Sequence, residues 1–206
     1  MGHGVFTESG AEKPAARPKR RRAKGRGTMT LLEYFGTPES ALPQELIYGA
    51  MHVAEAPLVN HQRAVLKLAM ALEQHVEPEG LGEVFTSPID VILDAGRALV
   101  LQPDLLYVSR DRREIVRERI YGAPDLVIEV LSPNPRIGAL RERVAWFAEY
   151  GVREIWLYDQ GARQVRVLHC ARGQVVSTET FNLFETLRSR VLPSFGRTIG
   201  SLVGTY

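Results

Sequence analysis

The spacing of apolar residues changes along the chain, and each change marks where one kind of element is expected to follow another. Residues 61–76 carry apolar side chains at 65, 66, 68, 69 and 72, which is the helical period, and Asn60 is the expected N-cap. Residues 136–150 form a second expected helix, which ends at Gly151. Strands are expected where short apolar runs are bounded by Pro, Gly or charged residues, at 88–93, 98–101, 104–108, 125–131 and 154–158.

The two ends of this pattern predict smaller elements. Residues 29–36 indicate a short amphipathic helix, and 45–53 a first strand with a kink at Gly49. Residues 164–169 and 174–180 flank Arg172-Gly173 and predict a hairpin, and a strand or turn and then a short helix are expected in the last twenty residues. This order of elements predicts an α/β fold of the α+β kind, with a mixed central sheet flanked by helices.

Charge separates the N-terminus from the rest of the chain. Residues 1–28 hold eight basic and two acidic side chains and no apolar periodicity, so we expect a disordered basic tail before a domain spanning 29–206. The tail either neutralises nucleic-acid phosphates, or is a solvated extension without a role, or results from a start assigned upstream of Met29. The residues of the tail expected to contact nucleic acid are Lys19, Arg20, Arg21 and Arg22.

Composition excludes several classes of protein. The single cysteine, Cys170, cannot form an internal disulfide or a cysteine-built zinc site. No apolar run of about 18 residues and no signal-peptide pattern is present, so we expect a cytoplasmic protein without a membrane span. No glycine-rich phosphate loop follows an expected strand, which makes a nucleotide-binding fold a weak interpretation.

Three carboxylates on expected strands are the candidates for metal chemistry. Asp125 and Glu129 share one face of the strand 125–131, but four residues of strand separate them by roughly 13 Å, too far to ligate one ion. Asp104 begins a different strand, and if the two strands are neighbours its carboxylate can converge with that of Glu129. We therefore expect Asp104 and Glu129 to form a metal pair, and Asp125 to cap a turn or strand entrance.

The sequence around these acids resembles a known family. The match is to the Uma-two family of putative restriction endonucleases, in the PD-(D/E)XK nuclease-like superfamily, and covers roughly residues 29–203. The resemblance rests on the segments 122–134 and 150–157, segment 45–49 in the first expected strand, Pro57, His61, Pro103-Asp104 and segment 191–193 near the C-terminus.

The resemblance implies an endonuclease that hydrolyses DNA phosphodiester bonds with Mg²⁺ or Mn²⁺ on a restriction-endonuclease-like fold. Asp104 and Glu129 would be the metal ligands, and Glu45 a further catalytic carboxylate. His61 either lies near the metal cleft, touching phosphate or water, or is a helix N-terminal histidine with a satisfied hydrogen bond. DNA is the implied partner, and many nucleases of the superfamily are homodimers.

The chain departs from the family where a lysine is expected. Leu131 stands at the superfamily's usual lysine position, and the acid and lysine that the family places on the following helix correspond to Ala139 and Arg143. Arg143 would replace the lysine as a phosphate clamp, although its guanidinium cannot act as a base. Lys67 is the only lysine after residue 28 and is expected to be a solvated helix residue.

These departures leave two alternatives to an endonuclease. One is a catalytically degenerate nuclease-fold protein that binds nucleic acid or a protein partner without cleavage. The other is a structural or oligomerising domain with no nucleic-acid role, since residues 29–206 carry a net charge of −4 and should not attract phosphate strongly without the tail.

Overall fold

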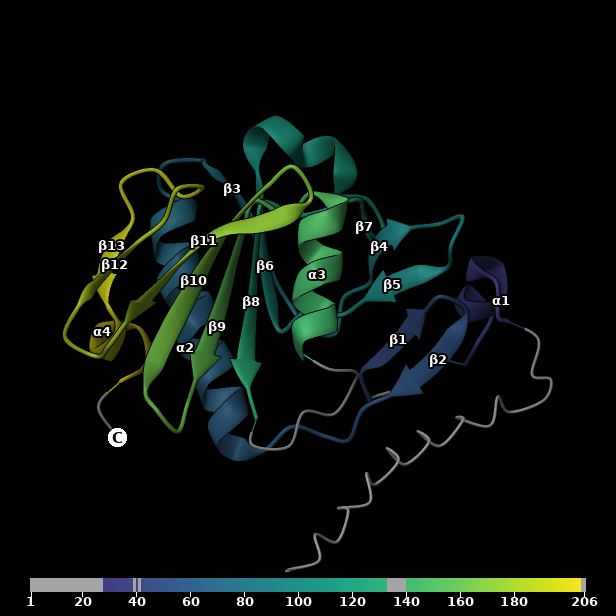
Figure 1. Ribbon diagram of the computed structural model, residues 1–206, viewed down its shortest axis with the longest axis horizontal. Helices are drawn as coiled ribbons and strands as arrows, with labels where there is room; N and C mark the ends of the chain where they lie inside the picture. Colours follow the sequence, from purple (N-terminus) through teal and green to yellow (C-terminus); the bar gives the residue numbers. More distant parts are fainter. Residues whose placement is uncertain (1–27, 39, 41, 133–139, 205–206) are drawn as a thin grey trace, which may run out of the picture.

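The computed structural model describes residues 28–38, 40, 42–132 and 140–204, whose strands form three sheets (Figure 1). The largest sheet has, in spatial order, β11 (Gln174–Phe181), β10 (Gln164–Ala171), β9 (Glu154–Asp159), β8 (Leu126–Leu131), β6 (Leu105–Ser109) and β3 (Gly82–Thr86). The second has β2 (Ala50–Val53), β1 (Gln44–Ile47), β5 (Leu99–Leu101), β4 (Val91–Asp94) and β7 (Ile120–Tyr121). A two-stranded ribbon pairs β12 (Thr186–Arg188) with β13 (Gly196–Thr198).

Helices cover both faces of the six-stranded sheet. The helices are α1 (Leu31–Phe35), α2 (Val59–Val76), α3 (Leu140–Tyr150) and α4 (Ile199–Val203), and a 3₁₀ helix, η1, spans Arg110–Ile115. Figure 1 shows α2 and α3 on opposite faces of this sheet. Strands β8 and β9 are parallel, and α3 lies between them in sequence, whereas the other pairs of this sheet are antiparallel. The mixed sheet flanked by helices that the sequence predicts is confirmed.

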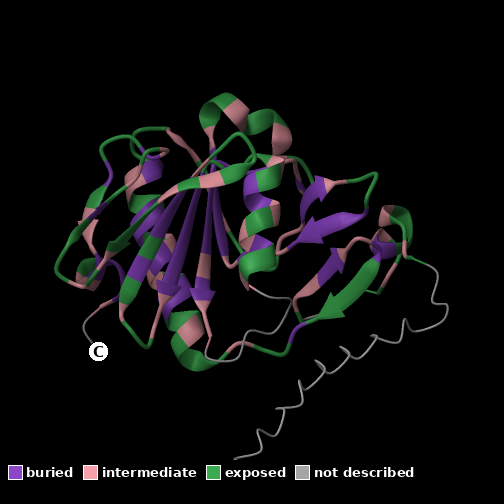
Figure 2. Ribbon diagram, viewed as in Figure 1, coloured by how far each residue is buried: buried purple, intermediate pink, exposed green. Residues whose placement is uncertain are grey.

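The central strands of the six-stranded sheet are mostly buried (Figure 2), and the side chains of successive residues fall into two core clusters. Leu105 and Ile128 pack in the cluster that contains the α2 side chains, while Leu106 and Val127 pack in the cluster that contains Phe147 of α3. Successive side chains of a strand point to opposite faces, so each strand contributes to both clusters. The strand residue two positions beyond Val127 therefore points toward the α3 side, and that residue is a glutamate.

The predicted kink at Gly49 is a complete reversal of the chain. Strands β1 and β2 form an antiparallel hairpin, and its turn residues Tyr48 and Gly49 both have positive φ, 49° and 83°. Two consecutive positive φ values are typical of a type I′ turn, which matches the twist of paired strands. A Cβ at Gly49 would meet the Cβ of Thr28 at 2.7 Å, so the close approach also requires glycine. The interpretation of 45–53 as one kinked strand was wrong for this reason.

Other boundaries differ from the sequence predictions. Helix α2 begins at Val59 with Leu58 as its N-cap, so the prediction of Asn60 as N-cap was wrong; the Asn60 side chain instead accepts a hydrogen bond from Arg63. The described part of α3 begins at Leu140, and the earlier part of the expected helix lies outside the described residues. Strand β3 was not predicted, because it is a half-exposed edge strand without a long apolar run. None of the helices in the described part of the chain is long and apolar enough to cross a membrane.

Candidate active site

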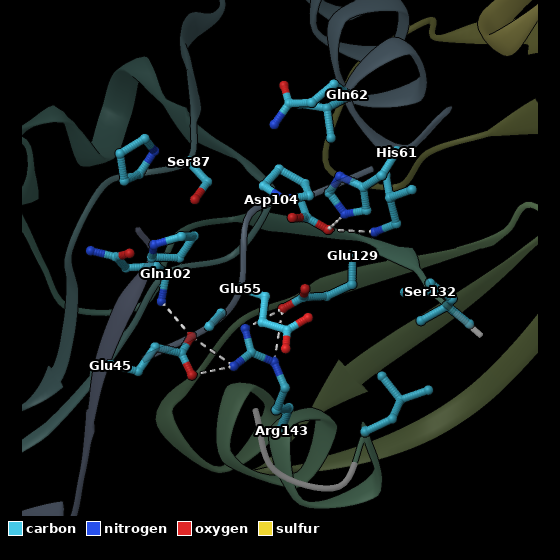
Figure 3. A pocket seen from close by; sticks show the side chains of 18 residues that line it. Glu45, Glu55, His61, Gln62, Ser87, Gln102, Asp104, Glu129, Ser132 and Arg143 are labelled. Atoms are coloured by element: carbon cyan, nitrogen blue, oxygen red, sulfur yellow. Dashed lines mark hydrogen bonds and ion pairs between the residues drawn. The ribbon is translucent and has the colours of Figure 1, made fainter. Parts of the chain in front are cut away.

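A cavity of about 300 Å³ opens where the end of β8 meets the hairpin β1–β2 and the starts of α2 and α3 (Figure 3). Both of the larger sheets contribute residues to it. Its lining consists of Pro43, Glu45, Ala54, Glu55, Pro57, His61, Gln62, Val65, Ser87, Pro88, Gln102, Asp104, Glu129, Val130, Leu131, Ser132, Leu140 and Arg143. It brings together all four of the residues predicted to be catalytic, and also His61.

The strand register places Asp104 and Glu129 next to each other. Antiparallel pairing joins Leu106 to Val127 and Leu105 to Ile128, so the next pair along the ladder is Asp104 with Glu129. The two side chains project to the same face because opposed residues of an antiparallel pair share a face. The expectation that the two acids lie on neighbouring strands and converge on one cavity agrees with this geometry.

Asp104 is held by hydrogen bonds to one of its two oxygens. Its Oδ2 accepts from the backbone N–H of Val130 at 2.8 Å and lies 3.1 Å from Nε2 of His61. The Asp104 carbonyl accepts from the N–H of Ser87 at 3.0 Å, which fixes the backbone as well. Among the described residues no hydrogen bond reaches Oδ1, so this oxygen is left for a further ligand. Nδ1 of His61 is buried and has no partner among them either.

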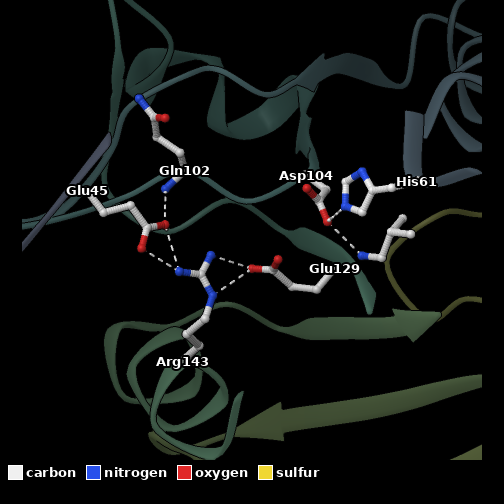
Figure 4. A network of polar contacts seen from close by, with 7 residues as sticks. Glu45, His61, Gln102, Asp104, Glu129 and Arg143 are labelled. Carbon is white, nitrogen blue, oxygen red and sulfur yellow. Dashed lines mark hydrogen bonds and ion pairs between the residues drawn. The ribbon is translucent and has the colours of Figure 1, made fainter. Parts of the chain in front are cut away.

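Arg143 lies between the carboxylates of Glu45 and Glu129 (Figure 4). Its Nη1 donates to both oxygens of Glu45 at 2.7 and 2.6 Å, and its Nε and Nη2 donate to Oε1 of Glu129 at 3.1 and 2.6 Å. Glu45 also accepts from the backbone N–H of Gln102 at 2.7 Å. The side chains of Glu45, Arg143 and Glu129 are 2%, 10% and 13% exposed, so this triad is largely withdrawn from water.

The buried position of Glu129 changes its acidity. Burial raises its pKa to about 7, and the charges of Asp104 and Glu45 act in the same direction, while the guanidinium of Arg143 opposes them. Near neutral pH the carboxyl is therefore close to half protonated. A positive charge brought to the open side of Glu129 would favour its ionised form.

We expect this raised pKa to make the fold less stable at higher pH. The ordinary value of 4.5 applies to the unfolded chain, so the folded state binds more protons between pH 4.5 and 7. The stability contribution of Glu129 should be fully present below pH 4.5 and lost as pH rises through about 7, by about 3 kcal/mol.

The measurement is urea denaturation in chelator at pH 5 and pH 8 for the wild type and Glu129→Gln, because a glutamine does not titrate. Taking the difference between the two proteins removes the titration of groups that both share. A wild-type minus Glu129→Gln difference that is the same at both pH values would contradict the assignment.

Other residues singled out in the sequence lie elsewhere. Asp125 is fully buried, and it accepts hydrogen bonds from the backbone N–H of Ser109 and from the side chains of Arg112 and Arg153. Burial raises its pKa, but the Ser109 bond and the two guanidinium groups outweigh burial and hold the pKa below its usual range. Asp125 is thus a structural ion-pair residue. Lys67 is absent from the cavity lining.

Some predicted residues fall on parts of the chain without a description. The basic residues Lys19, Arg20, Arg21 and Arg22 and the helix position Ala139 lie outside the described residues. Their predicted roles therefore stay predictions.

Sequence reasoning missed the contribution of Gln102 to the site. Its backbone N–H holds Glu45, its side-chain Oε1 accepts from the N–H of Gln44, and its Nε2 donates to Asp90. A signal was available in the sequence, because Gln102 lies two positions before Asp104, and residues two positions apart in an extended segment point to the same face. This residue connects the first strand to the segment that carries Asp104.

The carboxylate oxygens of the cavity suit a divalent cation that keeps part of its water shell better than one that is enclosed entirely by protein ligands. Among the described residues, no cluster of three or more His, Cys, Asp or Glu side chains is arranged to hold a metal ion. Magnesium is usually bound by one or two carboxylates and keeps several waters, which substrate phosphate can replace. Oδ1 of Asp104 and Oε2 of Glu129 accept no hydrogen bond within the described residues, and the four carboxylates that line the cavity outnumber the single positive charge of Arg143. Asp104 and Glu129 could therefore hold Mg²⁺ or Mn²⁺.

A solved structure from Anabaena variabilis ATCC 29413, described as "a putative nuclease belonging to DUF820", has a similar fold, with a TM-score of 0.72 and 19% identity over 85% of this chain and 97% of that chain. The chain belongs to the Uma2 family, described as "Putative restriction endonuclease", whose profile matches residues 31–200. The predicted family is thereby confirmed. A search of curated proteins finds no match.

Proposed function

We propose that this protein is a metal-dependent endonuclease that hydrolyses phosphodiester bonds of DNA in the cavity lined by Asp104 and Glu129. The observation that supports the proposal is the convergence of these two carboxylates, each anchored through one oxygen and open at the other. Membership of the Uma2 family supports the reaction class. A cytoplasmic location and a homodimer stay predictions from the sequence and from the family resemblance.

In this proposal Asp104 and Glu129 hold Mg²⁺ or Mn²⁺ through their open oxygens. When bound, the cation would polarise the phosphate and lower the pKa of the attacking water. The N–H of Val130 and the ring of His61 keep the Asp104 carboxylate in place. Glu129 must be ionised to serve as a ligand, so its raised pKa makes cation binding release a proton near neutral pH.

Arg143 acts in this proposal as a permanent counter-charge beside the ligand pair. It cannot take the role of a general base, because a guanidinium does not lose its proton in proteins. Its two hydrogen bonds fix Oε1 of Glu129, and the bidentate pair with Glu45 fixes Arg143 in turn. Glu45 is thus proposed as a positioning residue that acts through Arg143.

A second candidate function is nucleic-acid binding without cleavage. The specific observation in its favour is that Arg143 already pairs with two of the four carboxylates that line the cavity, which weakens the demand for a divalent cation. A protein of this kind would bind DNA in a salt-sensitive manner and leave it intact.

The test is a supercoiled-plasmid assay with the full chain, in Mg²⁺ and in chelator, combined with Mn²⁺ binding followed by electron paramagnetic resonance. We expect nicked or linear plasmid in Mg²⁺ alone, and one Mn²⁺ bound more tightly at pH 8 than at pH 6. Intact plasmid in both Mg²⁺ and Mn²⁺, with DNA binding retained, would reject the endonuclease and support the second candidate.

A further inference from the structure

A second cavity lies beside the first turns of α2, between that helix, the turn from β9 to β10 and the end of α4. Its volume is about 230 Å³, and its lining consists of Asn60, Arg63, Ala64, Tyr158, Gln160, Arg163, Val203 and Gly204. These side chains are separate from the proposed catalytic pair, Asp104 and Glu129.

The lining of this second cavity is cationic and has no carboxylate. Arg63 donates from Nη1 to the side-chain oxygen of Asn60 at 2.9 Å, and neither Arg63 nor Arg163 has an ion-pair partner among the described residues. Nη2 of Arg163 is buried and lacks a hydrogen-bond partner there. Leaving a buried charged donor unsatisfied is costly, so the cavity has the charge and the free donors that an anion requires.

The available donors suit a tetrahedral oxyanion. Two guanidinium groups can each present parallel N–H groups to phosphate oxygens, which is the preferred geometry for that group. Tyr158 adds a hydroxyl, whose pKa is raised by burial so that it stays a neutral donor, although Arg163 opposes the rise. The backbone N–H groups at the start of α2 add partial positive charge, since Leu58 provides no side-chain cap.

The two cavities flank the same two turns of α2. Residues Asn60, Arg63 and Ala64 line the second cavity, while His61 and Gln62 of the same helix line the first. At 3.6 residues per turn these two sets of residues point to opposite sides of α2, so the first turns of the helix lie between the two cavities.

A second link runs through the strands. Gln160, in the lining of the second cavity, donates from Nε2 to the carbonyl of Leu131 at 3.0 Å, and Leu131 lines the first. A nucleic-acid strand that passes over the start of α2 could therefore place phosphates in both cavities.

We propose that Arg63 and Arg163 form a phosphate-binding subsite that holds a backbone phosphate of a nucleic-acid strand whose other phosphate lies at Asp104 and Glu129, across the first turns of α2. This assignment rests on the proposed function for its substrate class, but not on cleavage. The same oxyanion chemistry would accept free phosphate, so the experiment separates the two sources.

The experiment measures binding of a fluorescent oligonucleotide duplex by anisotropy, in Ca²⁺, at several salt concentrations. The variants are Arg163→Gln and Arg63→Gln, with Arg163→Lys to keep the charge and Arg166→Gln as the matched control, because Arg166 is an exposed arginine of β10 outside both cavities. Thermal denaturation checks that each variant is folded.

We expect Arg163→Gln to weaken binding roughly tenfold and to lower the salt slope by about one, with a smaller loss for Arg163→Lys and none for Arg166→Gln. Inorganic phosphate at millimolar concentration should compete with the oligonucleotide on the wild type. Equal affinity and slope for Arg163→Gln and Arg166→Gln would overturn the proposal. Calorimetric binding of inorganic phosphate with no variant effect on the oligonucleotide would also overturn it, in favour of a free-anion site.

Cleavage is measured separately, so the two proposals can fail independently. A wild type that leaves plasmid intact but loses duplex affinity in Arg163→Gln refutes the endonuclease and supports the subsite. A wild type that cuts plasmid, with Arg163→Gln and Arg166→Gln indistinguishable in binding, refutes only the subsite.

Discussion

Replacing either member of the carboxylate pair, with Asp104→Asn or Glu129→Gln, should reduce Mg²⁺-dependent plasmid cleavage by about 1000-fold. Each substitution is nearly isosteric and removes one negative charge from an oxygen that would contact the cation. A metal ion contributes several kcal/mol to charge stabilisation, and about 4 kcal/mol corresponds to three powers of ten in rate. Initial rates of nicking under single-turnover conditions measure the loss.

A matched control separates the site from general charge effects. Glu142→Gln removes an exposed acid one position before Arg143 on α3, and it should leave the cleavage rate within twofold. Mn²⁺ binding should fall in Asp104→Asn and stay unchanged in Glu142→Gln. If Asp104→Asn and Glu129→Gln cleave at the wild-type rate, the two acids do not have the proposed roles.

Loss of the guanidinium between the two glutamates should be the most destabilising change in the site. We expect Arg143→Met to lower the free energy of unfolding by about 3–5 kcal/mol, since it leaves Glu45 and Glu129 buried without their counter-charge. Urea denaturation at pH 8 provides the measurement. The loss should be smaller at pH 5, where Glu129 is protonated.

The pairing itself is tested by removing the charge of Glu45 as well. The double variant Arg143→Met with Glu45→Gln should recover part of the lost stability, because one buried charge is no longer unpaired. Arg141→Met, an exposed neighbour on α3, should change stability by less than about 0.5 kcal/mol. An Arg143→Met protein as stable as Arg141→Met would show that the triad contributes little.

Much of the fold follows from local signals in the sequence. Helix α2 and the buried strands β6 and β8 have long apolar runs with a clear period, and their existence was predicted. The hairpin at Gly49 was not, because a single glycine indicates a break without specifying how far the chain turns. Strand β3 was missed because edge strands are stabilised by pairing with a neighbour, here β6, and this is a contact that local sequence does not encode.

The residues that form the candidate site were predicted, but the contacts among them were not. The geometric argument that Asp104 and not Asp125 meets Glu129 agrees with the register of β6 and β8. The pairing of Arg143 with both glutamates could not be derived, because it depends on how α3 packs across two sheets. The interpretation of Arg143 as a free phosphate clamp left out this contact.

The register between β6 and β8 also limits how this protein can change in length. A residue inserted in β8 ahead of Glu129 would turn this acid to the opposite face, among the apolar residues that pack against α2, and one inserted in β6 would shift the register that opposes Asp104 to Glu129. The connection between β6 and β8 lies at the end away from the acids, and its mostly exposed part is residues 113–118, which follow Arg112 and precede the paired strand β7. Insertions and deletions should therefore be tolerated in that connection, whether they arise among relatives or as an engineered tag or graft. They should not be tolerated within the paired strands β6 and β8.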